Sequence, residues 1–211
     1  MSESLPVPDV ARRISARLAA RYAGMVGPET VQAVVDDSYR RLAATATITQ
    51  FLPSLTARFA ADRLAAIARA EGVASAATPS VLFVCVENSG RSQLAGAILR
   101  ALAGDRVTVM TAGSEPGAGI ASGVAEVLDE VGIPVLAEYP KPLTDDLVRG
   151  ADHVITMGCG DACPVLPGRR YEDWAIADPV PGGIEGMRAA RDAITARVEG
   201  LLAQLRTGSV A

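Results

Sequence analysis

A cysteine and an arginine lie six positions apart in a stretch whose residue types can bind and attack an oxyanion. Cys85 follows an apolar run, and Arg91 and Ser92 close the stretch. Between them lie five residues that would form an anion-binding loop: Val86, Glu87, Asn88, Ser89 and Gly90. The planar guanidinium of Arg91 can hold two oxygens of a tetrahedral oxyanion. The hydroxyl of Ser92 can donate to the cysteine sulfur. The alternative is a structural cysteine buried at the end of a strand.

The flanking residues predict a strand before this loop and a helix after it. Residues 81–84 form a short apolar run that is typical of a buried parallel strand. Residues 93–103 place their apolar side chains on one helical face. The start of such a helix offers unpaired N–H groups and partial positive charge, which bind anions and favour a thiolate.

Two further cysteines, Cys159 and Cys163, follow the predicted strand 154–157. If this strand lies beside strand 81–84, roughly 5 Å away, Cys159 leaves the sheet at the same edge as Cys85. Residues four apart in a helical turn lie roughly 6 Å apart, which a disulfide can span. Three thiols could therefore converge in a relay. A structural disulfide and a metal site are the alternatives. Three cysteines and one distant histidine are a poor zinc set, so we expect no metal and no cofactor.

A carboxylic acid, Asp178, follows the last predicted strand in a polar loop. Held over an anion loop, it could protonate a leaving oxygen. Asp178-Pro179 is also an ordinary turn dipeptide, and the pair alone favours the turn. His153 lies at the start of a predicted strand, where a structural role is expected.

The patterning predicts two domains. Residues 1–75 carry three amphipathic helical stretches, which predict a small three-helix bundle. Residues 76–211 alternate strands and helices, which predicts an α/β domain with a four-stranded parallel sheet and helices on both faces. The strands are expected at 81–84, 106–111, 154–157 and 171–175, and the helices at 93–103, 120–131, 143–148 and 184–205.

Composition excludes several classes of protein. The chain has 211 residues, of which 49% are hydrophobic and 21% charged, as in globular proteins. No apolar run approaches the roughly 18 residues of a membrane span, and residues 1–9 lack a secretory pattern, so we expect a cytoplasmic protein. The net charge of −4 and dispersed arginines argue against nucleic-acid binding. We expect the helical bundle to serve packing or to form a homodimer.

Together these motifs resemble the low-molecular-weight protein tyrosine phosphatase fold and, within it, the thiol-relay arsenate reductases. The resemblance spans about residues 80–205. It rests on Cys85-x5-Arg91-Ser92, Thr111-Ala-Gly113, Val154-Ile-Thr-Met157 leading to Cys159, Cys163-Pro164, Trp174 and Asp178-Pro179. The loop alone is shared by several activities, and the two cysteines after the strand make the likeness more specific.

The resemblance implies a mechanism and a partner. Arsenate, a phosphate-like oxyanion, would bind to the loop and Arg91. The thiolate of Cys85 would attack arsenic, and Asp178 would protonate the departing oxygen. Cys159 would attack Cys85 and expel arsenite, and Cys163 would then attack Cys159. Thioredoxin, or a similar dithiol protein, would reduce the resulting Cys159–Cys163 disulfide.

The resemblance also implies that Ser92 holds the thiolate and that Asn88 braces the loop. Three features depart from the family pattern. The relay cysteines are closer in sequence than in familiar members. Glu87 places a carboxylate in the anion loop, where it should repel arsenate unless it points outward. Gly96 stands where some members carry a potassium-binding glutamate, so no potassium is expected.

Three other functions remain open on this sequence. A phosphatase would need Cys85, Arg91 and Asp178 but would have no use for the other cysteines. A reductase that draws electrons from a small thiol of the mycothiol type would need only the nucleophile. A non-catalytic sensor of arsenic or redox state would use the helical bundle as its output and would not turn over.

Overall fold

The computed structural model describes residues 9–46, 49–74, 78–134, 138–158 and 163–207. The chain divides into two compact units, Met1–Ala76 and Ala77–Ala211. Each unit has a hydrophobic core of its own. No described helix combines the length and the apolar character that crossing a bilayer requires.

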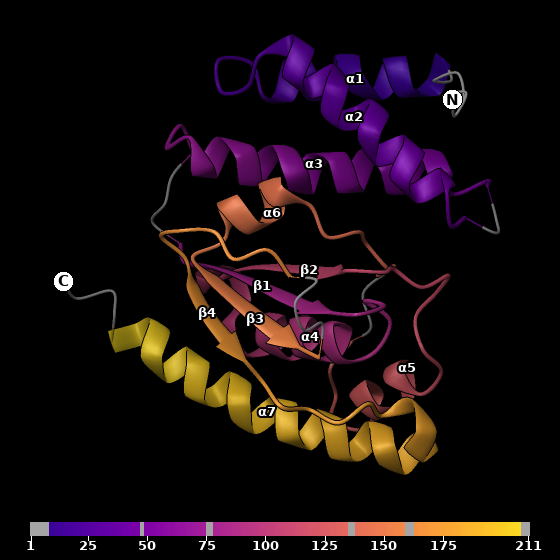
Figure 1. Ribbon diagram of the computed structural model, residues 1–211, viewed down its shortest axis with the longest axis vertical. Coiled ribbons are helices and arrows are strands. Elements are labelled where there is room, and N and C mark those ends of the chain that lie inside the picture. Colours follow the sequence, from indigo (N-terminus) through magenta and orange to yellow (C-terminus); the bar gives the residue numbers. More distant parts are fainter. Residues whose placement is uncertain (1–8, 47–48, 75–77, 135–137, 159–162, 208–211) are drawn as a thin grey trace. The chain divides into compact units, whose positions relative to one another are not determined.

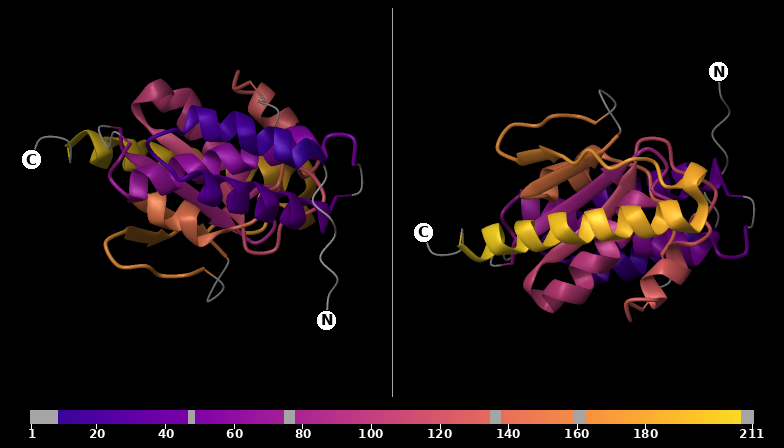
Figure 2. Two further views of the ribbon diagram at one scale, coloured as in Figure 1. Left: turned by 90° about the horizontal axis from the view of Figure 1, so that it is seen from above. Right: turned by 90° about the horizontal axis from the view of Figure 1, so that it is seen from below.

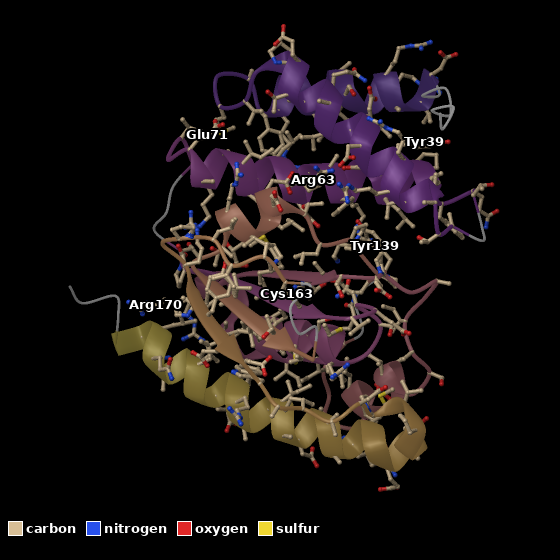
Figure 3. The ribbon with its side chains drawn as sticks, in the orientation of Figure 1. Tyr39, Arg63, Glu71, Tyr139, Cys163 and Arg170 are labelled. Atoms are coloured by element: carbon tan, nitrogen blue, oxygen red, sulfur yellow. The ribbon has the colours of Figure 1, made fainter. Side chains whose placement is uncertain are left out.

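The N-terminal unit consists of three helices: α1 (Asp9–Arg21), α2 (Pro28–Ala43) and α3 (Leu52–Ala70) (Figure 1). The first of the three predicted amphipathic stretches forms α1, and its Ile14 and Leu18 are buried in the core of this unit. Pro53 lies in the first turn of α3, so it starts the helix and does not kink it. Arg63, labelled in Figure 3, donates to Asp37 at 2.7 Å and to Ser38 at 3.0 Å, which ties α3 to α2.

The second unit is built on a parallel sheet in the order β2-β1-β3-β4. Its strands are β1 (Ser80–Cys85), β2 (Thr108–Gly113), β3 (His153–Met157) and β4 (Arg170–Asp173). The predicted four-stranded parallel sheet is therefore confirmed. In the register, Cys85 pairs with Gly113 on one side and with Met157 on the other. The carboxyl ends of these three strands thus meet at one edge, where ligands of parallel sheets bind.

Helices cover both faces of this sheet, as predicted. The helices are α4 (Arg91–Ala103), α5 (Val124–Asp129), α6 (Asp145–Gly150) and α7 (Gly183–Thr207). Side chains of α4, α5 and α7 share a core with Phe83 and Ile155 of the sheet, and α7 runs beside α4 across this face (Figure 2, right). Helix α6 lies on the opposite face (Figure 1). A buried side chain such as Phe83 contributes about 1.5–3 kcal/mol on leaving water.

The segment after β4 is anchored in the same core. Trp174 is 1% exposed, and its ring centroid lies 5.6 Å from that of Phe83 at an interplanar angle of 55°. Its indole nitrogen donates to the carboxylate of Glu172 at 3.1 Å. The segment that leads from Trp174 to Asp178 therefore begins at a residue that is held in the core.

The predicted helix 120–131 is wrong in its extent, because α5 begins only at Val124. Gly123 has a φ of +89°, in the left-handed region, which no α-helix can pass through. The residues before it instead run alongside the loop that follows β1. Val124, Val127 and Leu128 are buried in the core. Their helical spacing therefore predicts this part of the helix correctly, but its extension to the residues before them is wrong.

His153 is the only histidine of the chain and is 6% exposed. Burial, and then the positive charge of Arg170, lower its pKa below the ordinary value, whereas Asp152 and Glu172 oppose the shift. Because its pKa is lower in the folded chain, the unfolded chain takes up the proton first as the pH falls. We expect stability to decrease from pH 7 to pH 5, and His153→Gln to flatten this decrease. Urea unfolding at both pH values measures the free energy of unfolding. An equal decrease between pH 7 and pH 5 in the wild type and in His153→Gln would show that His153 is not the cause.

Candidate active site

The loop between β1 and α4 has the hydrogen-bonding pattern of an anion site. Its amide N–H groups, from residue 86 to residue 90, donate to no acceptor in the described part of the chain. Its carbonyl groups are instead satisfied by residues 114–121. Four backbone hydrogen bonds do this, each from an N–H group to a carbonyl oxygen: Ser114 donates to Cys85 (3.2 Å), Glu115 to Val86 (2.9 Å), Gly117 to Glu87 (2.9 Å) and Ala121 to Ser89 (3.0 Å). The loop thus keeps its donors for a ligand, as an oxyanion requires.

The sulfur of Cys85 lies 3.0 Å from the hydroxyl oxygen of Ser92, and the cysteine is 3% exposed. The side-chain amide of Asn88 donates to the same hydroxyl oxygen at 2.7 Å. Since a serine hydroxyl carries one hydrogen, this arrangement leaves that hydrogen for the sulfur. The three residues therefore form a chain of hydrogen bonds that ends at the sulfur.

Asn88 is fully buried and has a φ of +49°. Its side-chain oxygen accepts from the backbone N–H of Lys141 at 2.8 Å and from the amide of Gln93 at 3.1 Å. The amide of Gln93 also lies 3.0 Å from the backbone oxygen of Asn88. Asparagine tolerates the left-handed region better than most residues, and here it joins the loop to two neighbouring segments.

Arg91 is the first residue of α4, and its half-buried guanidinium lies between the ends of two strands. One of its nitrogens donates to the backbone oxygen of Ile176, beyond β4, at 3.2 Å. Gly158, directly after β3, borders the same guanidinium. A Cβ atom built on Gly158 would lie 2.6 Å from Nη1 of Arg91. The absence of a side chain at position 158 therefore makes room for the guanidinium.

Gly158→Ala should lower the affinity for inorganic phosphate about tenfold to a hundredfold. The methyl group displaces the guanidinium of Arg91, and hydrogen bonds to charged groups contribute about 1.5–3 kcal/mol. Calorimetric titration with phosphate measures this loss. Gly132→Ala is the matched control, because Gly132 also has a positive φ, of +70°, but has no atom within 4 Å of its Cβ position. Equal affinities of the two variants would contradict this role of Gly158.

Asp178 is exposed, and its carboxylate accepts from the N–H of Val180 at 3.1 Å. The adjacent Pro179 approaches the anion loop, since its ring lies 3.8 Å from the Cβ position of Gly90. On its other side, a Cβ atom on Gly186 of α7 would collide with the carbonyl of Pro179. The structure thus brings the Asp178 loop beside the anion loop. Within the described residues, no hydrogen bond links its carboxylate to Cys85 or Arg91.

The cysteines differ in their state. Cys85 is free, whereas Cys163, which is labelled in Figure 3, is half-buried and disulfide-bonded. Cys159 lies outside the described residues. The chain leaves β3 at the edge where Cys85 lies, because β3 pairs with β1 and Gly158 borders Arg91. Among the residues that the structure describes, no cluster of acidic, histidine and cysteine side chains could hold a metal ion.

Glu87 is exposed, and its carboxylate accepts from the hydroxyl of Ser89 at 2.9 Å. This hydrogen bond engages the acidic side chain with a residue of its own loop.

Sequence reasoning missed several residues that shape this site. Gln93 and the backbone of Lys141 hold Asn88, and neither carries a sequence signal for this role. Gly113 approaches the loop so closely that its Cβ atom would lie 2.6 Å from the backbone oxygen of Val86. Gly113 was recognised in the sequence as part of the Thr111-Ala-Gly113 strand end, but its close approach to the loop was not predicted.

A parallel sheet with a cysteine and an arginine around an anion loop at its carboxyl edge is the arrangement of a phosphatase-like protein. The family model "low molecular weight phosphotyrosine protein phosphatase" matches residues 80–210, and the model "protein-tyrosine-phosphatase-like, N-terminal domain" matches residues 11–68. The chain belongs to the low molecular weight phosphotyrosine protein phosphatase family.

Similar proteins include reductases and a phosphatase. The solved thioredoxin-dependent arsenate reductase of Corynebacterium glutamicum is 42% identical, with a TM-score of 0.86, and the match covers 95% of this chain and 98% of that one. The glutaredoxin arsenate reductase of Synechocystis is 31% identical over 59% of this chain and 97% of its own length. The arginine phosphatase of Geobacillus stearothermophilus is 29% identical, with a TM-score of 0.55, over 63% of this chain and 96% of that one.

Proposed function

We propose that this protein is an arsenate reductase that converts arsenate to arsenite through a relay of three thiols and is recycled by thioredoxin. The observation that carries the proposal is the pairing of an oxyanion loop around the free Cys85 with an oxidised cysteine, Cys163, on the segment that follows β3. The likeness to the reductase of Corynebacterium glutamicum, which extends over nearly the whole chain, supports it.

The first half of the reaction takes place in the anion loop. Arsenate binds to the amide N–H groups and to the guanidinium of Arg91. The thiolate of Cys85, which accepts the hydrogen bond of Ser92, forms a sulfur–arsenic bond. Asp178 donates the proton with which an arsenate oxygen leaves as water. The product is a covalent adduct of Cys85 in which arsenic is still pentavalent.

The second half transfers two electrons. The thiolate of Cys159 attacks the sulfur of Cys85, a disulfide forms, and the electron pair of the sulfur–arsenic bond passes to arsenic, which leaves as arsenite. Cys163 then attacks Cys159, which frees Cys85 and leaves a Cys159–Cys163 disulfide. A dithiol of thioredoxin is oxidised as it reduces this disulfide.

The two parts of the chain have separate roles in this proposal. Residues 76–211 form the catalytic domain. Residues 1–75 form a helical domain that associates two copies of the chain, and the separate family match of residues 11–68 supports a distinct domain. A cytoplasmic location fits thiols that must be kept reduced between turnovers.

An assay with arsenate, thioredoxin, thioredoxin reductase and NADPH tests the proposal, with a phosphate ester as the parallel substrate. We expect NADPH oxidation that depends on both arsenate and thioredoxin, and an equal amount of arsenite. Hydrolysis of the ester without arsenate-dependent NADPH oxidation would instead make the protein a phosphatase, the activity of the Geobacillus neighbour.

A further inference from the structure

An apolar segment follows Cys163 directly. Residues 164–167 read Pro-Val-Leu-Pro, and Val165 is 77% exposed, more than any other large hydrophobic residue in the described part of the chain. A solvent-exposed valine is ordinary when it stands alone. Here it stands two residues from a disulfide-bonded cysteine, in a run of four apolar residues. Any protein that reduces this disulfide must bring its thiol to bonding distance of a sulfur there, so it must also cover these residues.

Tyr171 of β4 holds this segment in one shape. Its hydroxyl accepts from the N–H of Leu166 at 2.7 Å and donates to the carbonyl of Pro164 at 3.3 Å. The ring is half-buried, and the residue pairs with Val154 of β3 in the sheet register. One hydroxyl group thus connects the backbone on both sides of Val165 to the sheet. Because the backbone is already ordered, docking of a partner onto Val165 freezes little further freedom.

Two arginines, Arg169 and Arg170, flank this segment on the side of β4. Arg170 is exposed at the first position of the strand (Figure 3). The chain as a whole has a net charge of −4, and Glu172 and Asp173 follow further along β4. The two arginines are therefore the charged residues nearest in sequence to the apolar run on this side. A partner with apolar residues around its thiols and carboxylates at the rim matches this combination.

We propose that residues 164–167 are the docking strip for the dithiol protein that reduces the Cys163 disulfide, and that Tyr171 is the positioning residue that holds the strip. The inference rests on the proposed function only in that the disulfide must be reduced in each turnover. The strip adds no chemistry of its own. The dithiol of the partner is oxidised to a disulfide, and the disulfide at Cys163 is reduced to two thiols.

The test follows the reduction of the oxidised full-length chain, without arsenate, by reduced thioredoxin and separately by dithiothreitol, with the freed thiols counted by labelling. Dithiothreitol is a dithiol that needs no docking. We expect Tyr171→Phe to lower the second-order rate with thioredoxin about threefold to tenfold, the effect of lost hydrogen bonds, and to leave the rate with dithiothreitol unchanged. We expect Val165→Ser to act in the same way, and higher salt to slow thioredoxin alone.

Val131→Ser is the matched control, since Val131 is also exposed, at 51%, but lies after α5. Unchanged thioredoxin rates in both Tyr171→Phe and Val165→Ser would overturn the proposal, and so would an equal loss with both reductants. Should Tyr171→Phe fail to fold, Val165→Ser still decides. This assay contains no arsenate, so it tests docking separately from the proposed function. A wild-type chain that thioredoxin reduces here, but that makes no arsenite when arsenate is supplied in the coupled assay, would contradict the proposed function and leave the docking strip standing.

Discussion

Cys85→Ser should abolish arsenite production, with a turnover rate lower by at least about 10⁴-fold, the order of loss seen when an enzymatic nucleophile is removed. A serine hydroxyl at this position is not ionised near neutral pH, so it cannot form the bond to arsenic. The change replaces only the sulfur atom by oxygen. The hydroxyl of Ser92 already lies beside this atom and can hydrogen-bond to the new hydroxyl, so the loop should keep its shape. Arsenite formed in the presence of thioredoxin, its reductase and NADPH is the quantity to measure.

Phosphate binding provides the control for this variant. Because the amide N–H groups and Arg91 remain, the dissociation constant of phosphate should change by less than about threefold, which is less than the loss of one typical hydrogen bond would cause. Appreciable arsenite production by Cys85→Ser would remove Cys85 as the nucleophile. A loss of phosphate binding in the same variant would show that the loop had collapsed.

Cys163→Ser should confine the enzyme to a single turnover. The first two thiols still deliver two electrons to arsenic, so about one equivalent of arsenite per chain is expected. The oxidised form then carries its disulfide on Cys85 itself, which blocks the next arsenate. Rapid-quench measurement of arsenite gives the stoichiometry, and mass spectrometry of the quenched chain should find Cys85 joined to Cys159.

The steady state separates this relay from the small-thiol alternative. With thioredoxin, its reductase and NADPH, Cys163→Ser should show no sustained NADPH oxidation. Normal steady-state rates in this variant would mean that Cys163 is dispensable and would favour a donor of the small-thiol class. Equal thermal unfolding temperatures of the reduced variant and the reduced wild type would exclude a folding defect as the cause.

The parts of the fold that depend on short-range pattern could be predicted from the sequence. The apolar run before Cys85 and the helical spacing after Arg91 specify the strand, loop and helix, because each element is determined by residues within it. The sequence left open whether β1 and β3 are neighbours, because an alternation of strands and helices does not determine the order of the strands in the sheet. The helix predicted to start at Ile120 failed because one glycine, Gly123, adopts a positive φ that apolar spacing does not register.

The parts of the site that depend on contacts between distant segments could not be predicted. Gly158 matters because the guanidinium of Arg91, 67 positions earlier in the chain by the numbering, fills the space where its side chain would be. Tyr171 matters because its hydroxyl reaches two backbone groups of the preceding loop. Neither residue type is unusual for its place in the sequence, so only the folded geometry distinguishes them.

The position of Asn88 has a consequence for the thermodynamics of the loop. Its amide and its side-chain oxygen are engaged by Ser92, Gln93 and the backbone of Lys141, and its φ of +49° is held by those bonds. These bonds exist without an anion, so the loop is preorganised. The entropy of ordering the loop is therefore lost when the chain folds. An arriving oxyanion finds its donors in place, and the cost of their arrangement appears in the stability of the protein and not in the affinity for its ligand.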